Sequence, residues 1–434
     1  MTTKTKYLII GAGLTGLSAA YHLSDNYLLV ESSDFPGGTA STVKLEGFKL
    51  DNSVHVLYFR DNSIKNWIEN ILKVDLLMNK RISSVWINGK YVPFPLQYNL
   101  SYLPLIERIR CANSLIHSMI RWKTNKVRQN FEEYSQSTFG NYLTQVFVRP
   151  YNEQLFGVSL SELNTDWLGD YLPKSSRYKI LLSAFRVNHF GYGRNSIFYY
   201  PREGGISTLA ENLSDSLKLK PMYNRTLKKI ILSNNTAVLN DDSEIQYDFL
   251  INTIPLADFL SKCDSLPFEI LGAADCLKKR STTLLHLLVK GKTKRKDHWI
   301  YIADSKIPFY RITFPGNINL ANCPEGYFAL TIEYGGEVLD RDLVMKESIA
   351  TLERIEILEK NNLIIEFYWR LIDCGYVIYD QHRKSVLEKI FPFLENNLIF
   401  SIGRYGGWEY SNMEDAILHG KNIAGKLSGL KKLH

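Results

Sequence analysis

The chain has 434 residues, of which 45% are hydrophobic and 22% charged, and these globular values exclude a disordered or collagen-like protein. The net charge of +7 is modest and the basic residues are scattered, so a nucleic-acid duplex is not indicated as a partner. The five cysteines are widely spaced, which favours a reducing compartment and argues against a disulfide framework or a zinc site. No apolar run approaches the roughly 18 residues of a membrane helix, and we expect a cytoplasmic protein without a bound metal.

The start of the chain predicts a βαβ unit. The apolar run from Tyr7 to Ile10 ends at glycines and is typical of a buried parallel strand. Apolar residues then recur with helical spacing from Leu14 to Leu23, and 28–30 form a second short apolar run. A strand, a helix and a second strand in this order are the first half of a nucleotide-binding fold.

Three glycines lie at the turn between the first strand and the helix. Gly11, Gly13 and Gly16 match G-x-G-x-x-G, in which the glycines permit a tight turn, close approach to a pyrophosphate and packing of the helix on the strand. The amides at the helix N-terminus add hydrogen-bond donors for the phosphates. Glu31 follows the second strand and can accept hydrogen bonds from a ribose diol. This pattern predicts a bound dinucleotide.

A second glycine pair favours FAD over NAD. Gly37 and Gly38 lie in F-P-G-G-T-A-S, six residues after Glu31, and Gly47 and Asp51 follow. This arrangement resembles FAD proteins of the amine-oxidase-like superfamily. A second glycine pair suits FAD because its flavin half needs another close approach of the backbone. The residues expected to contact FAD in this segment are Gly38, Thr39 and Ala40.

The rest of the chain predicts further helices and strands. Helical patterns cover 63–77, most of the stretch up to 179, 340–360 and 412–427. A hairpin is expected around Asn88-Gly89, and strands are expected at 228–232, 237–239, 249–254 and within 284–332.

The expected fold class is α/β: a Rossmann-type FAD-binding domain with an inserted, mostly helical subdomain and an antiparallel-sheet substrate subdomain. The nucleotide-binding segments are split along the chain, so we expect these subdomains to be insertions into the flavin domain. The expected division is FAD-binding at 1–80, 196–260 and 376–434, helical nucleotide and substrate binding at 81–195, and the substrate sheet at 261–375.

Later segments of the chain sharpen the resemblance. These segments resemble those of UDP-galactopyranose mutases, in particular the eukaryotic-type branch. They occur in the same order as in that family and together span nearly the whole chain. The matching segments are Arg81-Ile-Ser83, Gly89-Lys-Tyr-Val-Pro-Phe-Pro-Leu-Gln97 with Asn99, Phe147-Val-Arg149-Pro-Tyr-Asn152, Phe156, Trp167-Leu-Gly169, Pro201-Arg-Glu-Gly-Gly205, Trp299-Ile-Tyr301, Pro308-Phe-Tyr-Arg311, Gly375-Tyr376 and the run from Gly403 to Met413.

This resemblance implies an isomerase that converts UDP-galactopyranose to UDP-galactofuranose, as a step in making cell-surface glycans. In that family reduced FAD is the nucleophile: its N5 forms an adduct with the sugar and expels UDP, and the sugar recloses in the other ring form. NADH or NADPH is the candidate reductant, a UDP-sugar or another nucleotide sugar the candidate ligand, and a homo-oligomer the candidate assembly.

The resemblance also assigns substrate residues. Arg311 matches a diphosphate-binding arginine, and Tyr301, Tyr376 and Tyr410 match tyrosines that bind the same diphosphate. The expected nucleotide contacts are Phe94, Gln97, Asn152 and Phe156. A surface ion pair for Arg311 and plain core packing for the aromatic residues are the structural alternatives.

At the flavin, His55 matches a histidine loop that faces the ring, and a neutral imidazole there could relay a proton. An ordinary buried histidine is the alternative. Arg404, Asn412 and Met413 match the pyrimidine side, where the N-terminus of the last helix would favour an anionic reduced flavin.

The chain departs from the family in two places. Ser53 and Val54 stand where the family has glycines before the histidine, so the loop motion that accompanies flavin reduction is expected to change. Tyr171 stands where the family has an arginine on a mobile loop. Lys174 or Arg177 is then expected to contact the diphosphate in its place.

Two other functions stay open. The N-terminal glycine pattern also fits a redox flavoenzyme, such as an amine oxidase, a desaturase or a protoporphyrinogen oxidase, although such an enzyme has no need for Arg311 among clustered tyrosines. The departures alone suggest a flavin-binding or nucleotide-sensing protein without activity. A redox enzyme consumes an electron acceptor stoichiometrically, whereas a mutase needs only catalytic reductant.

Overall fold

Two large sheets organise the computed structural model, which describes residues 2–122, 128–169, 175–185 and 196–430. The first is a six-stranded sheet in which β1 lies between two parallel neighbours, β2 and β11. β17 pairs with β11 in parallel, and β9 and β10 extend the sheet in antiparallel pairs. The strands are β1 (Thr2–Ile10), β2 (Tyr27–Val30), β9 (Leu227–Ile231), β10 (Thr236–Leu239), β11 (Glu244–Asn252) and β17 (Ile399–Ser401).

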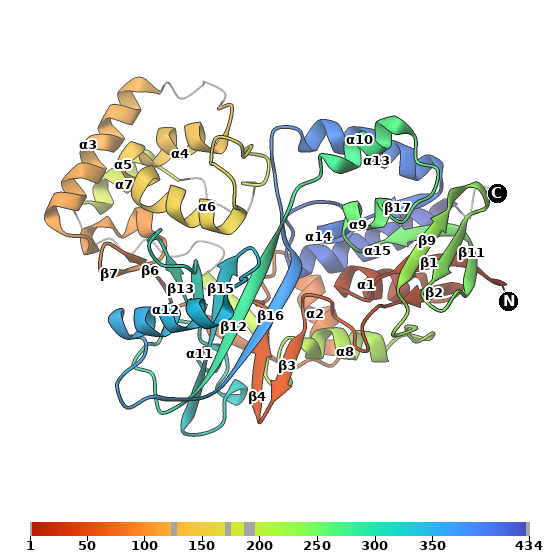
Figure 1. The fold of residues 1–434 in the computed structure, drawn as a ribbon, viewed down its shortest axis with the longest axis horizontal. Helices are drawn as coiled ribbons and strands as arrows, with labels where there is room; N and C mark the ends of the chain where they lie inside the picture. The colour runs from red at the N-terminus through yellow and green to blue at the C-terminus, as the bar shows by residue number, and fades with distance from the viewer. Residues whose placement is uncertain (1, 123–127, 170–174, 186–195, 431–434) are drawn as a thin grey trace.

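Helices from opposite ends of the chain cover this first sheet. α1 (Leu14–Leu23) packs along α15 (Met413–Leu430), with the Ser18 hydroxyl donating to the Ile417 carbonyl at 2.7 Å. Helices α9 (Leu256–Leu260), α10 (Phe268–Asp275) and α13 (Arg383–Asn396) pack in the second apolar cluster of the sheet. The chain therefore returns to its first helix with its last one, as Figure 1 shows.

The second sheet has seven strands in the order β16-β12-β15-β14-β13-β6-β7, and every pair except β13–β6 is antiparallel. β12 and β16 are its longest strands and run side by side toward the first sheet (Figure 1). α12 (Arg341–Arg354) packs against an apolar cluster of this sheet. The strands are β6 (Ser83–Ile87), β7 (Lys90–Pro93), β12 (Lys279–Lys290), β13 (Trp299–Ile302), β14 (Arg311–Thr313), β15 (Tyr327–Gly335) and β16 (Leu363–Val377).

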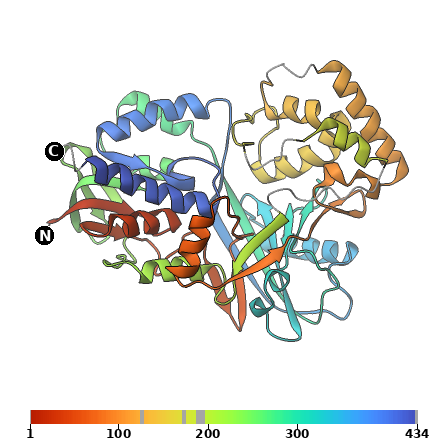
Figure 2. The same cartoon turned by 180° about the vertical axis from the view of Figure 1, so that it is seen from behind.

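A group of helices lies beside the second sheet, on the side away from the chain termini (Figures 1 and 2). It surrounds its own apolar cluster, which includes Leu115, Leu143 and Leu160. Its members are α3 (Leu105–Arg121), α4 (Phe131–Phe139), α5 (Asn141–Leu143), α6 (Arg149–Phe156) and α7 (Arg177–Ser183).

Short elements connect these layers. β3 (Thr42–Leu45) pairs with β4 (Phe48–Asp51), and β5 (Leu76–Lys80) pairs with β8 (Ile197–Pro201). α2 (Asn62–Asn70) and α8 (Ser207–Asp215) have buried residues in the core of the first sheet. The small helices α11 (Pro315–Ile318) and α14 (Gly403–Gly406) follow strands β14 and β17.

The expected fold class is confirmed, with local differences. The predicted hairpin forms at Asn88 and Gly89, whose φ values of 49° and 73° suit a tight turn of that kind. For the helix expected over 63–77, the predicted end is wrong, because α2 ends at Asn70 and β5 begins at Leu76. β6 and β7, in the range assigned to the helical part, pair within the second sheet. Across the described ranges, no helix is both long and apolar enough to cross a bilayer.

Candidate active site

A single cavity of about 1010 Å³ brings together residues from the first sheet, the second sheet and the helical group. Its lining begins at the glycine loop after β1, continues along the loop after β4, and ends among side chains of β13, β14 and α6. The predicted cofactor and substrate residues that line it are Gly11, Gly13, Glu31, Gly38, Thr39, Ala40, His55, Phe94, Gln97, Asn152, Phe156, Tyr301, Arg311, Tyr376, Arg404, Tyr410, Asn412 and Met413.

The glycine loop has the backbone that the sequence pattern requires. Gly11 has a φ of +98°, and a Cβ on Gly16 would lie 2.0 Å from the Gly11 carbonyl oxygen, so only glycine fits at Gly16. A Cβ on Gly13 would meet nothing within 4 Å, which leaves this backbone open to a ligand. No side chain caps the N-terminus of α1. The amides there can therefore bind a pyrophosphate.

Glu31 is fixed at the end of β2. Its carboxylate accepts hydrogen bonds from the amides of Ala12 (2.6 Å) and Ser33 (2.8 Å), and the residue is only 7% exposed. The second glycine pair lies beside it, because the Gly37 amide donates to the Ala12 carbonyl at 2.8 Å. The two glycine segments and the acid therefore form one end of the cavity, as expected for the adenosine half of FAD.

Changing Gly16 to Ala should abolish flavin binding, because the new methyl group would collide with the Gly11 carbonyl and push α1 away from β1. We expect the purified variant to lack the visible absorbance of bound flavin. Gly425→Ala is the matched control, since a Cβ there meets nothing within 4 Å and alanine favours a helix. A Gly16→Ala protein with full flavin content would contradict this assignment of the loop.

His55 lies in the loop that follows β4. The residue is half-buried, and its Nδ1 atom is buried without a hydrogen-bond partner among the described residues. Burial, together with the nearby Arg404 guanidinium, lowers the pKa of His55 to about 4. The imidazole is therefore neutral near pH 7 and can accept a proton at Nδ1.

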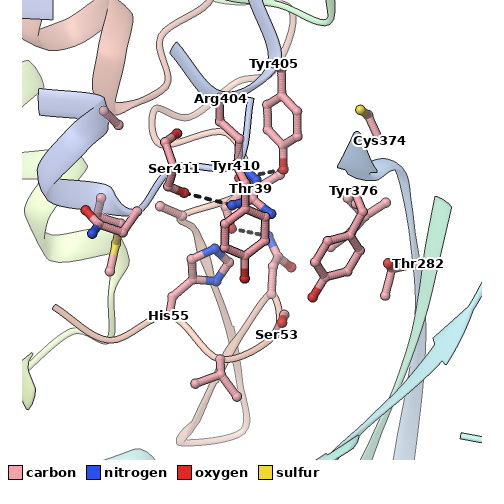
Figure 3. Close-up of a pocket in the computed structure, with 18 of the residues that line it drawn as sticks. Thr39, Ser53, His55, Thr282, Cys374, Tyr376, Arg404, Tyr405, Tyr410 and Ser411 are labelled. Atoms are coloured by element: carbon pink, nitrogen blue, oxygen red, sulfur yellow. Dashed lines mark hydrogen bonds between the residues drawn. The ribbon is translucent and has the colours of Figure 1, made fainter. Parts of the chain in front are cut away.

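Arg404 lies close to His55 and two tyrosines. Its Nη1 atom donates to the Ser411 carbonyl at 2.8 Å, and its Cζ atom lies 4.6 Å from the centre of the Tyr410 ring. The rings of Tyr410 and Tyr376 stack with centres 6.5 Å apart and planes 13° apart. Figure 3 shows these side chains around the same space as His55. The arrangement places one cation and two phenols beside the neutral imidazole.

The last helix starts at the same wall of the cavity. Asn412 caps it reciprocally: its Oδ1 accepts from the Asp415 amide (2.9 Å), and its own amide donates to Asp415 Oδ2 (3.0 Å). The amides of Met413 and Glu414 have no acceptor within the described ranges. This helix end can therefore stabilise negative charge on a bound group.

Arg311 is held by a buried carboxylate. Its Nε and Nη2 atoms donate to the two oxygens of Glu333 at 2.7 and 2.6 Å, and Nη2 also contacts the Tyr376 hydroxyl at 3.4 Å. Burial alone would lower the pKa of Arg311, but the Glu333 carboxylate reverses this and holds it well above its usual value. Nη1 has no hydrogen-bond partner among the residues described. The bidentate pair therefore leaves a fixed cation with one free edge in the cavity wall.

More phenols surround this ion pair. The Tyr310 hydroxyl donates to Glu333 at 3.1 Å, and Tyr301 accepts from Arg81 Nη2 at 2.9 Å. The ring of Tyr151 stands edge-on to Tyr301, with centres 5.4 Å apart. Burial raises the pKa of both Tyr151 and Tyr310, so these phenols stay protonated. Tyr151 lines the cavity and can donate a hydrogen bond without adding negative charge near an anion.

The predicted nucleotide contacts form the wall farther from the glycine loop. Phe94 packs against Tyr301 (centres 5.0 Å apart) and lies under the Arg81 guanidinium at 4.4 Å. The Asn152 amide donates to the Val148 carbonyl at 2.7 Å. The remaining two residues, Gln97 and Phe156, are both buried.

Several buried polar atoms in the cavity wall lack partners in the described part of the chain. A buried polar group without a hydrogen bond costs free energy, so these atoms indicate a polar ligand in contact with them. They are Asn52 Oδ1, His55 Nδ1, Thr282 Oγ1, Trp299 Nε1 and Ser411 Oγ. The donor and acceptor set, together with the glycine backbone, fits FAD.

Some residues differ from expectation. Tyr171 and Lys174 lie outside the described residues. Arg177 does not line the cavity: its Nη1 donates to the Trp122 carbonyl at 3.3 Å, while Lys179 of the same helix lines the cavity. Gly16 packs behind the cavity wall and shapes the loop from there. Four residues that line the cavity had no cofactor or substrate role assigned from the sequence: Arg81, Ser53, Tyr151 and Glu333.

Comparison with known proteins identifies the protein family of this chain. Residues 14–317 match the model of the flavin-containing amine oxidoreductase family, so the chain belongs to that family and its cofactor is FAD. Coproporphyrinogen III oxidase of Bacillus subtilis (strain 168) is 21% identical over 276 residues, which are 56% of this chain and 58% of that protein. The corresponding oxidase of Staphylococcus aureus is 22% identical over 290 residues, 58% of this chain and 61% of that protein. The chain thus spans little more than half of the length of these curated relatives.

Two solved structures match nearly the whole chain. A crystal structure of reduced UDP-galactopyranose mutase is similar to it with a TM-score of 0.93 and 27% identity, covering 98% of this chain and 94% of the mutase. A putative protoporphyrinogen oxidase from Exiguobacterium sp. 255-15 has a TM-score of 0.75 and 16% identity, covering 98% and 99%. This second likeness shows the shared fold alone.

Proposed function

We propose that the chain is a flavin-dependent sugar-nucleotide mutase that interconverts the pyranose and furanose forms of a nucleotide sugar, with UDP-galactopyranose and UDP-galactofuranose as the pair. The observation that carries the proposal is the Arg311–Glu333 pair, which fixes a cation in the wall of the cavity that the flavin loop also lines. The likeness to the reduced mutase over nearly the whole chain supports it.

The substrate diphosphate would bind at Arg311. The free Nη1 edge can donate to phosphate oxygens, and the hydroxyls of Tyr301, Tyr376 and Tyr410 can donate from the surrounding wall. Charge builds on the diphosphate when the bond to the sugar breaks. Donors that are already fixed stabilise that charge without reorganisation, which lowers the barrier. Lys174 and Tyr171 stay predictions for this diphosphate.

The uridine would lie in the far wall. Phe94 offers a ring face for stacking, and the amides of Gln97 and Asn152 can pair with the edge of a base. Phe156 stands edge-on to Trp167 and Tyr376, with ring centres 5.4 and 5.9 Å apart, so it would shape the pocket.

FAD, when bound and reduced, supplies the nucleophile, with NADH or NADPH as the proposed reductant. Glu31 and the two glycine segments would hold its adenosine and pyrophosphate half. His55, Arg404 and the start of α15 would face its ring, where the cation and the helix N-terminus favour negative charge. His55 would accept and return one proton at Nδ1.

Incubation of the protein with UDP-galactofuranose tests the proposal. We expect dithionite-reduced protein to yield UDP-galactopyranose by chromatography and oxidised protein to yield none. A panel of other nucleotide furanoses run in parallel identifies the sugar. A reduced, flavin-loaded protein that isomerises no member of the panel would reject the proposal.

A redox flavoenzyme is the second candidate, favoured by the coproporphyrinogen III oxidase relatives. It would oxidise its substrate and pass the electrons to an acceptor such as oxygen. Oxygen consumption with coproporphyrinogen III, measured beside the isomerase assay, separates the two functions. The mutase proposal predicts no oxygen uptake above that of free flavin.

A further inference from the structure

Ser53 has a backbone conformation that is unusual for its residue type. Its φ is +71°, in the left-handed region where side chains other than glycine are disfavoured. Such a residue typically costs about 1–3 kcal/mol and persists only where surrounding contacts hold it. The backbone at Ser53 is therefore strained, and a glycine would relieve the strain. The contacts of the serine side chain explain how this conformation is held.

The Ser53 hydroxyl joins the buried ion pair. It donates to Glu333 Oε2 at 2.9 Å and accepts from Arg311 Nη2 at 2.8 Å. Nη2 also donates to the same Oε2 at 2.6 Å, so the three side chains form a closed triangle. They come from the loop after β4 and from strands β14 and β15. The triangle links the His55 loop directly to the proposed anion-binding arginine.

We propose that Ser53 is a positioning residue that fixes the free edge of Arg311 toward the diphosphate and ties the His55 loop to it. This inference rests on the proposed function of the same cavity. Glu333 accepts hydrogen bonds from Nε and Nη2, and the Ser53 hydroxyl accepts a further one from Nη2, so the guanidinium cannot change its position without breaking three hydrogen bonds. Only Nη1 remains for a ligand, and its direction is set.

The link also acts in the other direction. An anion bound to Arg311 would partly neutralise the guanidinium that donates a hydrogen bond to the Ser53 hydroxyl. Ser53 is only two residues from His55, so a shift of Ser53 would also move the His55 loop. Binding of a diphosphate and placement of the imidazole are therefore coupled through one hydroxyl. Without that hydroxyl the loop loses its hydrogen bonds to Arg311 and Glu333 of the second sheet.

Two substitutions separate the hydroxyl from the backbone. Ser53→Ala removes Oγ and keeps the strained backbone, whereas Ser53→Gly removes Oγ and relieves the strain. Ser265→Gly is the matched control, because Ser265 is exposed, has a φ of +52° and does not line the cavity. All variants are tested as flavin-loaded full chains, with thermal unfolding measured alongside.

The readout is the Kd for UDP and for inorganic pyrophosphate, followed by the change in flavin absorbance. We expect both Ser53 variants to raise each Kd by about ten- to a hundredfold, as one lost hydrogen bond to a charged group predicts, and Ser265→Gly to leave both unchanged. We also expect UDP to perturb the flavin spectrum less in both Ser53 variants, because the link to the His55 loop is gone.

Wild-type affinity in Ser53→Ala, or a change confined to Ser53→Gly, would overturn the inference, since the hydroxyl would then have no role. The proposed function fails separately. If the wild-type protein binds pyrophosphate and the Ser53 variants bind it more weakly, yet no furanose is isomerised, the positioning role stands and the mutase assignment falls. If wild-type protein binds neither anion, both are rejected.

Discussion

Changing Arg311 to Ala should reduce kcat/KM for the nucleotide furanose by at least about a hundred- to a thousandfold, the usual effect of removing one fixed donor to a developing anion. The guanidinium is the cation that Glu333 orients, and its Nη1 edge is the part left for a ligand. UDP binding, followed by flavin absorbance, should weaken in parallel. Arg311→Lys should recover little, because a lysine cannot form the bidentate pair and present a further donor at once.

The same change should also destabilise the fold, which calls for a control. Removing one partner of a buried ion pair typically costs about 3–5 kcal/mol, because Glu333 would keep an unpaired charge. The double variant Arg311→Met with Glu333→Gln removes both charges and should recover most of the unfolding temperature. Activity must stay low in this double variant. Recovery of activity together with stability would show that Arg311 supports only the fold.

Changing His55 to Gln should lower kcat by about a hundred- to ten thousandfold, the range for loss of a general acid or base, with UDP affinity nearly unchanged. Glutamine keeps a polar side chain of similar size but cannot exchange a proton near neutral pH. His55 has a buried, unpartnered Nδ1 in the wall where we propose that the flavin ring lies. Equal kcat values for wild type and variant at saturating substrate would reject a proton-transfer role.

His55 also predicts a pH dependence of stability. Its pKa in the folded chain is about 4, below the value near 6.5 of an exposed histidine, so the folded state binds fewer protons in between. Stability should therefore fall as the pH drops from about 6.5 to about 4. His55→Gln should lose this part of the pH dependence. His286 and His298, whose pKa values are also lowered, are present in both proteins, so the difference isolates His55.

The cofactor end of the site could be predicted because its logic is local. Gly11, Gly13 and Gly16 lie within one turn, and Glu31 follows at the end of the next strand. Residues that are close in the sequence are therefore also close in the structure, and a sequence motif is enough to find them. The fold class followed from the same pattern and from the split nucleotide-binding segments. The structure confirmed the fold, and the family match confirmed the cofactor.

The partner of Arg311 could not be predicted in this way. Glu333 lies 22 residues further along, on β15, and it meets Arg311 only because β14 and β15 pair in antiparallel register. A lone glutamate within an apolar strand carries no sequence pattern that names its partner. The one available signal was its position, since a charge in a fully buried strand must be paired.

Ser53 shows a different limit. A serine in place of glycine predicts less backbone freedom at this position, and the positive φ of Ser53 confirms that the backbone is strained there. The gain, a hydroxyl bonded to two residues more than 250 positions away, depends on tertiary contacts. The contacts of Tyr171 and Lys174 stay predictions, because both lie outside the described residues.

In the proposed reaction, one cavity holds a reduced flavin against a nucleotide sugar whose diphosphate leaves and returns. The most direct measurement reduces the flavin once, removes excess reductant without oxygen, adds UDP-galactofuranose and counts product molecules per flavin. We expect many turnovers per flavin, with the flavin still reduced at the end. At most one product per flavin, with the flavin oxidised as product appears, would contradict it.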